Sequence, residues 1–201
     1  MSLDLRSFAP ATERNRDVIL AVLQRLLPDE GTVLEIGAGT GEHAVYFAQH
    51  FPALMWQPTE MDQTFLASIQ AWIAHAGVDN VAAPNRLDVT ETNWPVEQAD
   101  AIVCINVIHY SPWASTRALF EGAARLLPDE GLLYCYGPYM RGNRHTAPSN
   151  EQFDAWLKTR NPAFGVRNLE DVQGEAQAQG LHLDEVVEMP ANNLSLVFRK
   201  R

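Results

Sequence analysis

The chain has 201 residues, of which 46% are hydrophobic and 20% charged, a composition that excludes a mainly disordered protein. Its formal net charge of -10 repels nucleic-acid phosphates, and no apolar run approaches the roughly 18 to 20 residues that span a bilayer. We therefore expect neither a membrane span nor an extended nucleic-acid surface. The expected protein is a single cytoplasmic domain over residues 1–201, with a helix at 12–27 that caps a core at 32–201.

Helices and strands alternate along the first two thirds of the chain. Apolar residues at helical spacing predict helices near 12–27, 44–52, 65–77 and 115–127. Short apolar runs predict strands near 32–36, 54–59, 81–87, 101–105 and 132–136. Thr12 is the expected cap of the first helix. Pro58 is expected to end the second strand early, because proline donates no hydrogen bond to a sheet.

The chain ends in a pattern of alternating apolar residues. Leu194, Leu196 and Phe198 alternate after a turn at 190–193, which predicts an antiparallel hairpin over 181–199. Helices that alternate with strands predict an α/β fold with a doubly wound, mostly parallel, Rossmann-like sheet. A terminal antiparallel hairpin on such a sheet is typical of class I methyltransferases.

Two further local patterns predict structure rather than chemistry. The hexapeptide Leu-Leu-Pro-Asp-Glu-Gly occurs at 26–31 and again at 126–131, where it is expected to end a helix and start a strand. Cys104 and Cys135 each lie in an apolar run, which predicts buried reduced thiols rather than a disulfide. No spacing typical of a metal site is present, so no metal is expected.

The most informative segment is a glycine turn between a predicted strand and a predicted helix. Its glycines are Gly37, Gly39 and Gly41, and Glu42 stands where a dinucleotide-binding fingerprint has its third glycine. Such a turn brings backbone N–H groups close to a ligand. The departure at Glu42 favours a nucleoside ligand without phosphates, as S-adenosylmethionine is. Glycine loops are also often turns and nothing more.

Acidic and polar residues follow the other predicted strands. Glu60 can accept hydrogen bonds from both ribose hydroxyls, Asp88 can accept from the adenine amino group, and Asn106 can contact the sulfonium end. Each of these residues has an alternative role as a helix or turn cap. The expected cofactor-binding residues are Glu35, Gly37, Ala38, Gly39, Gly41, Glu60, Asp88 and Asn106.

The segments after the fourth and fifth strands are the expected substrate side of the site. His109 and His145 are the candidate general bases, although His109 is equally compatible with a packing role. The stretch 137–150 is long and polar and is expected to form a lid or wall. Its arginines indicate an anionic group on a small-molecule substrate, unless they pair with nearby acids. The expected substrate-binding residues are Tyr110, Tyr139, Arg141, Arg144 and Asn150.

The quoted residues resemble one family over nearly the whole chain. It is the DUF938 (UPF0585) group of methyltransferase-like proteins, whose animal members are called methyltransferase-like protein 26. The resemblance is carried by the segments 10–15, 35–43, 56–58, 136–139, 144–150 and 189–194. It implies a class I fold that binds S-adenosylmethionine, and it implies no substrate.

Three functions are compatible with these patterns. The first is a methyltransferase that uses S-adenosylmethionine and acts on a small, anionic molecule. The second is a module that binds S-adenosylmethionine or S-adenosylhomocysteine and regulates or docks to a partner without transferring a methyl group. The third is a nicotinamide-dependent oxidoreductase, which Glu42 and the terminal hairpin disfavour. The sequence leaves the oligomeric state open.

Overall fold

The computed structural model describes residues 4–201 and divides the chain into two compact units, Met1–Val103 and Cys104–Arg201. Its main sheet has seven strands in the order β3-β2-β1-β4-β5-β10-β9, mostly parallel, with β10 antiparallel to β5 and β9. The strands are β1 (Gly31–Ile36), β2 (Leu54–Glu60), β3 (Asn85–Arg86), β4 (Ala101–Ile105), β5 (Leu132–Gly137), β9 (Leu181–Met189) and β10 (Asn193–Lys200). The predicted α/β fold with a C-terminal antiparallel hairpin is confirmed, and the single domain stays a prediction.

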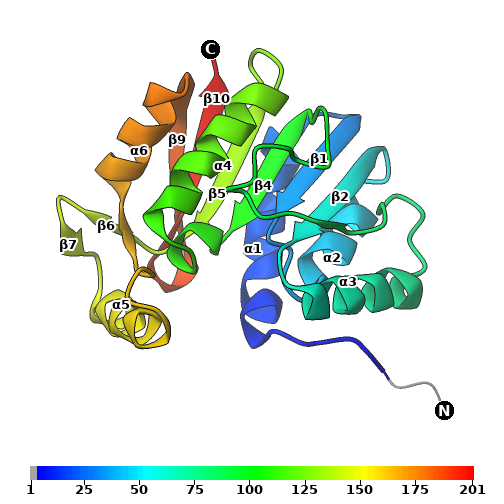
Figure 1. The fold of residues 1–201 in the computed structure, drawn as a ribbon, viewed down its shortest axis with the longest axis horizontal. Coiled ribbons are helices and arrows are strands. Elements are labelled where there is room, and N and C mark those ends of the chain that lie inside the picture. Colours follow the sequence, from blue (N-terminus) through cyan, green and yellow to red (C-terminus); the bar gives the residue numbers. More distant parts are fainter. Residues whose placement is uncertain (1–3) are drawn as a thin grey trace. The chain divides into compact units, whose positions relative to one another are not determined.

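In the first unit, three helices accompany the parallel pair β1 and β2 (Figure 1). They are α1 (Pro10–Leu26), α2 (Glu42–His50) and α3 (Gln63–Ala76). Helix α2 contacts both α1 and α3, and α2 and α3 both contact β2. Large side chains are fully buried in this unit, among them Leu34, Phe47, Trp56 and Ile69. Each such burial stabilises the fold by about 1.5–3 kcal/mol, which holds the carboxyl ends of β1 and β2 in place.

Helix α1 begins two residues before the predicted cap. Pro10 is its first residue, Ala9 is the N-cap, and Thr12 is buried inside the helix, so the prediction that Thr12 caps it is wrong. Proline suits the first position because it has no N–H to satisfy there and its φ is already helical. The Ala9 N–H donates to the Glu42 carboxylate at 2.6 Å. This bond ties the start of α1 to the first residue of α2.

Pro58 lies inside β2 and does not end it, contrary to expectation, because the strand continues to Glu60. The Trp56 N–H and the Glu60 carbonyl both bond to the segment 80–87, on the side of β3. Alternate residues of a strand direct their backbone groups to the same side, so the missing N–H of Pro58 also lies there. Pairing with β3 begins only at Thr59, and the strand therefore loses no ladder bond at the proline.

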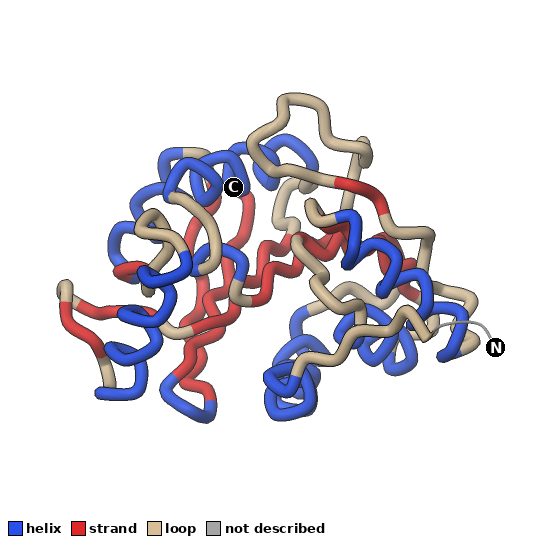
Figure 2. The backbone as a smooth tube through the Cα atoms, turned by 60° about the horizontal axis from the view of Figure 1, so that its bottom comes forward, coloured by secondary structure: helices blue, strands red, loops and turns tan. Residues whose placement is uncertain are grey.

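The predicted third strand is much shorter than expected. β3 holds two residues, and an isolated bridge joins Val81 to Trp56. Residues 87–100 contain no helix or strand (tan in Figure 2). At the end of this segment the Asp100 N–H donates to the Thr32 carbonyl at 2.9 Å, and its carboxylate accepts from the Thr32 N–H at 2.7 Å. The segment is thus tied to β1 before β4 begins.

The second unit contains the terminal hairpin and a small sheet of three strands in the order β7-β6-β8. The small strands are β6 (Tyr139–Arg141), β7 (Arg144–His145) and β8 (Arg167–Asn168). The helical segments are η1 (Val107–His109), α4 (Trp113–Leu126), α5 (Pro148–Arg160), α6 (Leu169–Ala178) and η2 (Pro190–Asn192). Helix α6 lies along β9 and contacts α4 (Figure 1). The stretch 137–150, expected as a long polar loop, instead folds into β6, a turn, β7 and the start of α5.

The repeated hexapeptide folds in the same way twice. α1 ends at Leu26 and α4 at Leu126, and the next leucine in each case donates its N–H to the carbonyl four residues before it. A strand follows each time, which confirms the predicted role as a helix stop. Cys104 and Cys135 are buried and free, also as predicted. The neighbouring Cys104 thiol, together with burial, raises the pKa of Cys135, so the Cys135 thiol stays protonated.

Candidate functional site

The glycine turn after β1 needs glycine at three positions. Gly37, Gly39 and Gly41 have φ values of 64°, 56° and 93°, a region that side chains disfavour. A Cβ on Gly41 would lie 2.7 Å from the Cα of Ile69, so this glycine lets α3 pack against the turn. A Cβ on Gly39 would meet no heavy atom of residues 4–201 within 4 Å. Gly41 therefore serves packing, whereas Gly39 borders space that a ligand can enter.

Helix α2 begins directly after this turn and has no side-chain cap among the described residues. Its first N–H groups therefore remain available, and the helix dipole favours a negative group near them. Glu42 already contributes such a charge. Its carboxylate accepts from the Thr40 hydroxyl at 2.8 Å as well as from the Ala9 N–H. The Ala38 N–H donates to the Thr59 carbonyl at 2.9 Å, which fixes the turn against β2.

Glu60, at the end of β2, lies beside the glycine turn as the sequence predicted. One carboxylate oxygen accepts from the Gly39 N–H at 2.9 Å. The other accepts from the N–H groups of Met61 at 2.7 Å and Asp62 at 3.1 Å. A carboxylate has about four lone-pair positions, so about one remains for a ligand. That position can accept from one ribose hydroxyl, not from both as was expected, and the ribose contact itself stays a prediction.

Glu35 lies deeper in the first unit than the other predicted cofactor residues. Its side chain is only 2% exposed, and its carboxylate accepts from the Trp56 indole N–H at 2.7 Å. Burial raises the pKa of Glu35 to about 7, the Trp56 bond opposes that rise, and the charge of Glu60 adds to it. The hydroxyl of Thr59 donates to the Glu35 carbonyl at 2.7 Å. These contacts explain Glu35 as a structural residue, and its predicted cofactor contact is untested.

Asp88 follows β3, at the same end of the strands as Glu60. One of its carboxylate oxygens accepts from the hydroxyl of Thr90 at 2.7 Å and from its N–H at 2.9 Å. These bonds lower the pKa of Asp88, so the side chain is ionised at neutral pH. The second oxygen has no hydrogen bond within the described part of the chain. It is available to accept from an amino group, as the prediction for adenine requires.

In the second unit, Asn106 follows β4 in the left-handed conformation, with φ of 62°. Its N–H donates to the Tyr136 carbonyl at 2.8 Å. A Cβ on Gly137 would lie 3.0 Å from the Asn106 amide oxygen and 2.5 Å from Nε2 of His109. Gly137 thus leaves room for two polar side chains that pack on the end of β5. The predicted contact of Asn106 with the cofactor stays a prediction.

His109 and Tyr139 are brought together, but in the interior. Both are fully buried, with ring centroids 4.9 Å apart in an edge-to-face arrangement. Neither ring nitrogen of His109 nor the Tyr139 hydroxyl has a hydrogen-bond partner among the described residues. Burial, followed by the charge of Arg167, lowers the pKa of His109 to about 3. The ring is therefore neutral at pH 7, which allows it to accept a proton only if a donor reaches it.

We expect His109→Phe to remove a pH-dependent loss of stability. The folded-state pKa of about 3 lies below the unfolded value of 6.5, so stability falls as the pH drops below 6.5. At pH 5 this group alone lowers the free energy of unfolding by about 2 kcal/mol relative to pH 7. Urea unfolding at both pH values measures the effect. The variant should lose less stability than the wild type at pH 5, and an equal loss would contradict the buried neutral state.

His145 forms a pair with a buried carboxylate. Its Nε2 lies 3.6 Å from the carboxylate of Asp154, whose side chain is 9% exposed, and its Nδ1 has no partner among residues 4–201. Asp154 also accepts from the Lys158 ammonium at 2.5 Å and from the Val166 N–H at 2.8 Å. A carboxylate beside one ring nitrogen favours a proton there and leaves the other as the acceptor. The Nδ1 is itself buried, so it can accept a proton only from a group that reaches it, and the role of His145 as a general base stays a prediction.

The remaining predicted substrate residues differ in their surroundings. Tyr110 is 43% exposed. Arg141 pairs with Glu188 at 2.8 Å, so its charge is compensated, whereas Arg144 is exposed. Asn150 is buried, and its amide donates to the Thr146 hydroxyl and to the carbonyl of Asn192 in the hairpin turn. Tyr110 and Arg144 can thus meet a ligand at the surface, while Asn150 joins α5 to the hairpin.

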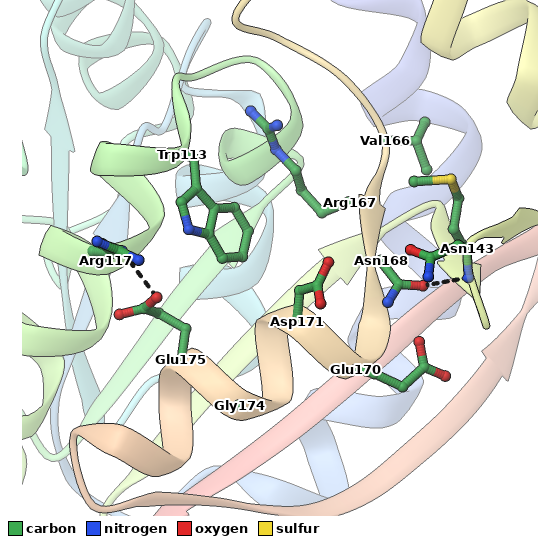
Figure 3. Close-up of a pocket in the computed structure, with 11 residues that line it drawn as sticks. Trp113, Arg117, Asn143, Val166, Arg167, Asn168, Glu170, Asp171, Gly174 and Glu175 are labelled. Carbon is green, nitrogen blue, oxygen red and sulfur yellow. Dashed lines mark hydrogen bonds and ion pairs between the residues drawn. The ribbon is translucent and has the colours of Figure 1, made fainter.

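A pocket of 590 Å³ lies in the second unit, lined from α4, β6, β8 and α6 (Figure 3). Arg117 pairs with Glu175 across it at 3.0 Å, and the Arg167 guanidinium lies 5.8 Å from the centroid of the Trp113 ring. The lining residues are Trp113, Arg117, Met140, Asn143, Val166, Arg167, Asn168, Glu170, Asp171, Gly174 and Glu175. None of the individually predicted site residues is among them, although Met140 and Asn143 belong to the stretch 137–150 that was expected to form a wall. Sequence patterns did not reveal the pocket as a whole, because α4, β6 and the consecutive elements β8 and α6 are distant from one another in the chain.

Within residues 4–201, no group of three or more His, Cys, Asp and Glu side chains is arranged to hold a metal ion. No helix of the same residues has the length and apolar character needed to cross a membrane.

The chain matches the model of one known protein family. The model is described as "Protein of unknown function (DUF938)" and matches residues 6–200. The chain belongs to the DUF938 family. The resemblance found in the sequence is confirmed, and the family brings no established reaction with it.

Solved structures support the fold of this DUF938 chain. An O-methyltransferase family protein from Burkholderia thailandensis aligns with a TM-score of 0.81 and 17% identity, over 94% of this chain and 56% of that one. CalO1, a methyltransferase of calicheamicin biosynthesis with bound S-adenosylhomocysteine, aligns with a TM-score of 0.73 and 18% identity, over 95% and 56%. The YcgJ protein of Bacillus subtilis aligns with a TM-score of 0.69 and 15% identity, over 94% and 99%. At these identities the likeness shows a shared fold and no more. The chain spans little more than half of the length of the first two proteins.

Proposed function

We propose that this DUF938 protein binds S-adenosylmethionine at the glycine turn and transfers its methyl group to a small molecule. The observation that carries the proposal is the open space beside Gly39, whose N–H is held by Glu60. A ligand can approach this backbone closely, and the start of α2 favours a negative group such as an amino-acid carboxylate. The SAH-bound methyltransferase CalO1, which shares the fold, supports the same cofactor.

Bound S-adenosylmethionine supplies an activated methyl group on a positively charged sulfur. The remaining task of the protein is to align the acceptor and, where the acceptor carries a proton, to remove it. We propose that His145, rather than His109, removes this proton. The side chain of His145 is 21% exposed and lies beside the Asp154 carboxylate, although its Nδ1 is buried, whereas the whole side chain of His109 is enclosed. The small acceptor and the cytoplasmic location remain parts of this proposal.

The proposal is tested by titrating S-adenosylmethionine and S-adenosylhomocysteine calorimetrically into the wild type and two glycine variants. Gly39→Ala adds a methyl group to the proposed site. Gly77→Ala is its matched control, because Gly77 has a similar φ of 62° and equally open surroundings among residues 4–201, at the end of α3. We expect tenfold weaker binding or more for Gly39→Ala, about 1.4 kcal/mol, and unchanged binding for Gly77→Ala.

Four results would contradict or redirect this assignment. Absence of binding by the wild type at about 1 mM ligand would remove the cofactor from the proposal. Equal effects of the two glycine variants would place the cofactor elsewhere. Tight binding of a nicotinamide cofactor instead would favour an oxidoreductase. Binding of S-adenosylmethionine without conversion to S-adenosylhomocysteine in the presence of candidate acceptors would favour the regulatory module.

A further inference from the structure

An exposed group of aromatic side chains lies on the second unit and shares no residue with the lining of the pocket of Figure 3. It consists of Tyr110, which follows η1, and Phe153 and Trp156, three residues apart on α5. The Tyr110 ring centroid lies 5.8 Å from that of Phe153 and 6.0 Å from that of Trp156, and Phe153 and Trp156 stack at 5.8 Å. We call these three residues the aromatic cluster. All three distances are those of interacting rings, so the cluster is a preformed surface.

The cluster remains open to solvent although aromatic side chains usually bury most of their area. Tyr110 is 43% exposed and Trp156 is 42% exposed, whereas Tyr139, on β6, is fully buried. Adjacent exposed rings leave aromatic surface available for stacking by another planar group. Stacking on aromatic side chains is a general source of affinity for planar groups, as nucleic-acid bases show.

A positive charge accompanies the cluster. The Arg160 guanidinium lies 4.7 Å from the centroid of the Trp156 ring, and no described carboxylate forms an ion pair with it. Lys158, on the same last turn of α5, pairs with Asp154. On a chain with a net charge of -10, an uncompensated arginine beside exposed rings favours a ligand with a negative group.

The cluster follows a strand end at which ligands are expected. Tyr110 comes five residues after the end of β4, and ligands of open parallel sheets bind beyond the carboxyl ends of their strands. Phe153 precedes Asp154 on α5, and the Asp154 carboxylate lies 3.6 Å from Nε2 of His145. One helix therefore carries two of the rings and the acidic neighbour of this histidine.

We propose that the aromatic cluster and Arg160 form a binding site for a planar aromatic molecule with an anionic substituent, which stacks on the rings and pairs with the guanidinium. A small ligand is favoured over a protein partner because three partly exposed rings provide far less than the roughly 800 Å² per partner that a stable interface buries.

The test measures binding of 1-hydroxy-2-naphthoate by tryptophan fluorescence and by NMR, without cofactor. Trp156→Ala removes the central ring of the cluster, and Arg160→Gln removes the charge. Trp113→Ala is the matched control, because Trp113 also lies beside a guanidinium but lines the other pocket. We expect about tenfold weaker binding for Trp156→Ala and for Arg160→Gln, and no change for Trp113→Ala. In the wild type the indole N–H signal of Trp156 should shift on titration.

Two further ligands separate the contributions of ring and charge. Cyclohexanecarboxylate has the charge without the ring and should not bind, while 2-naphthol should bind weakly and be insensitive to Arg160→Gln. No naphthoate binding at about 1 mM, equal binding of both carboxylates, or loss of binding in Trp113→Ala would overturn the proposal. So would self-association of the wild type that Trp156→Ala abolishes, because the cluster would then be an interface. Titration of S-adenosylmethionine into the same variants shows separately whether the cofactor site is intact.

Discussion

Replacing Gly41 by alanine should lower the free energy of unfolding by about 3 kcal/mol or more. The new Cβ would lie 2.7 Å from the Cα of Ile69 and 3.0 Å from its Cγ1. A backbone atom cannot rotate away as a side-chain end can, so α3 would have to move relative to the turn. The φ of 93° adds strain of its own for a residue with a side chain. Chemical denaturation at pH 7 measures the loss.

Gly39→Ala provides the comparison within the same turn. It also introduces a side chain at positive φ, but no heavy atom of residues 4–201 lies within 4 Å of the new Cβ. The free energy of unfolding should fall by about 1 kcal/mol in this variant, because only the backbone strain at positive φ is added. Ile69→Ala combined with Gly41→Ala should not restore stability, since the backbone of residue 69 would still clash with the new methyl group. Similar losses for the two single variants would show that the backbone at Ile69 relaxes easily.

These two glycines show what the sequence could and could not distinguish. The turn itself was predictable, because the need for positive φ is local and appears as glycine at alternate positions. Which glycine packs against α3 and which borders open space depends on residue 69, which is distant in the chain. The same limit applies to Glu35 and Glu60. Both acids were predicted beside a cofactor, but the burial that separates them comes from packing between strands.

Helix α5 shows a second limit of the sequence patterns. Its buried residues are Asn150, Asp154 and Leu157, which have helical spacing but are mostly polar. Apolar periodicity does not reveal such a helix, and no helix was predicted over residues 148–160. The polar residues can be buried because their partners come from elsewhere, including the Asn192 carbonyl and the Val166 N–H. The hairpin β9–β10, by contrast, has apolar alternation and was predicted correctly.

The second large effect concerns the buried carboxyl group of Glu35. Its folded-state pKa of about 7 lies above the ordinary value of 4.5, so the unfolded chain loses the proton first as the pH rises. Stability is therefore lost between about pH 4.5 and pH 7, and the full cost of about 3 kcal/mol applies above pH 7. Glu35→Gln removes the titrating group and keeps an oxygen acceptor for the Trp56 indole. The variant should be more stable than the wild type at pH 8, by up to this amount, and similar to it near pH 4.5.

Urea unfolding followed by tryptophan fluorescence at the two pH values tests this expectation. Glu121→Gln is the control for loss of a negative charge, since Glu121 is exposed on α4. It should leave the difference between the two pH values unchanged. A Glu35→Gln variant that is less stable than the wild type at pH 8 would show that the carboxylate is ionised and favourably bonded there. Glu35 would then be a charged residue next to the glycine turn, as a direct role toward the cofactor requires, and not a neutral structural residue.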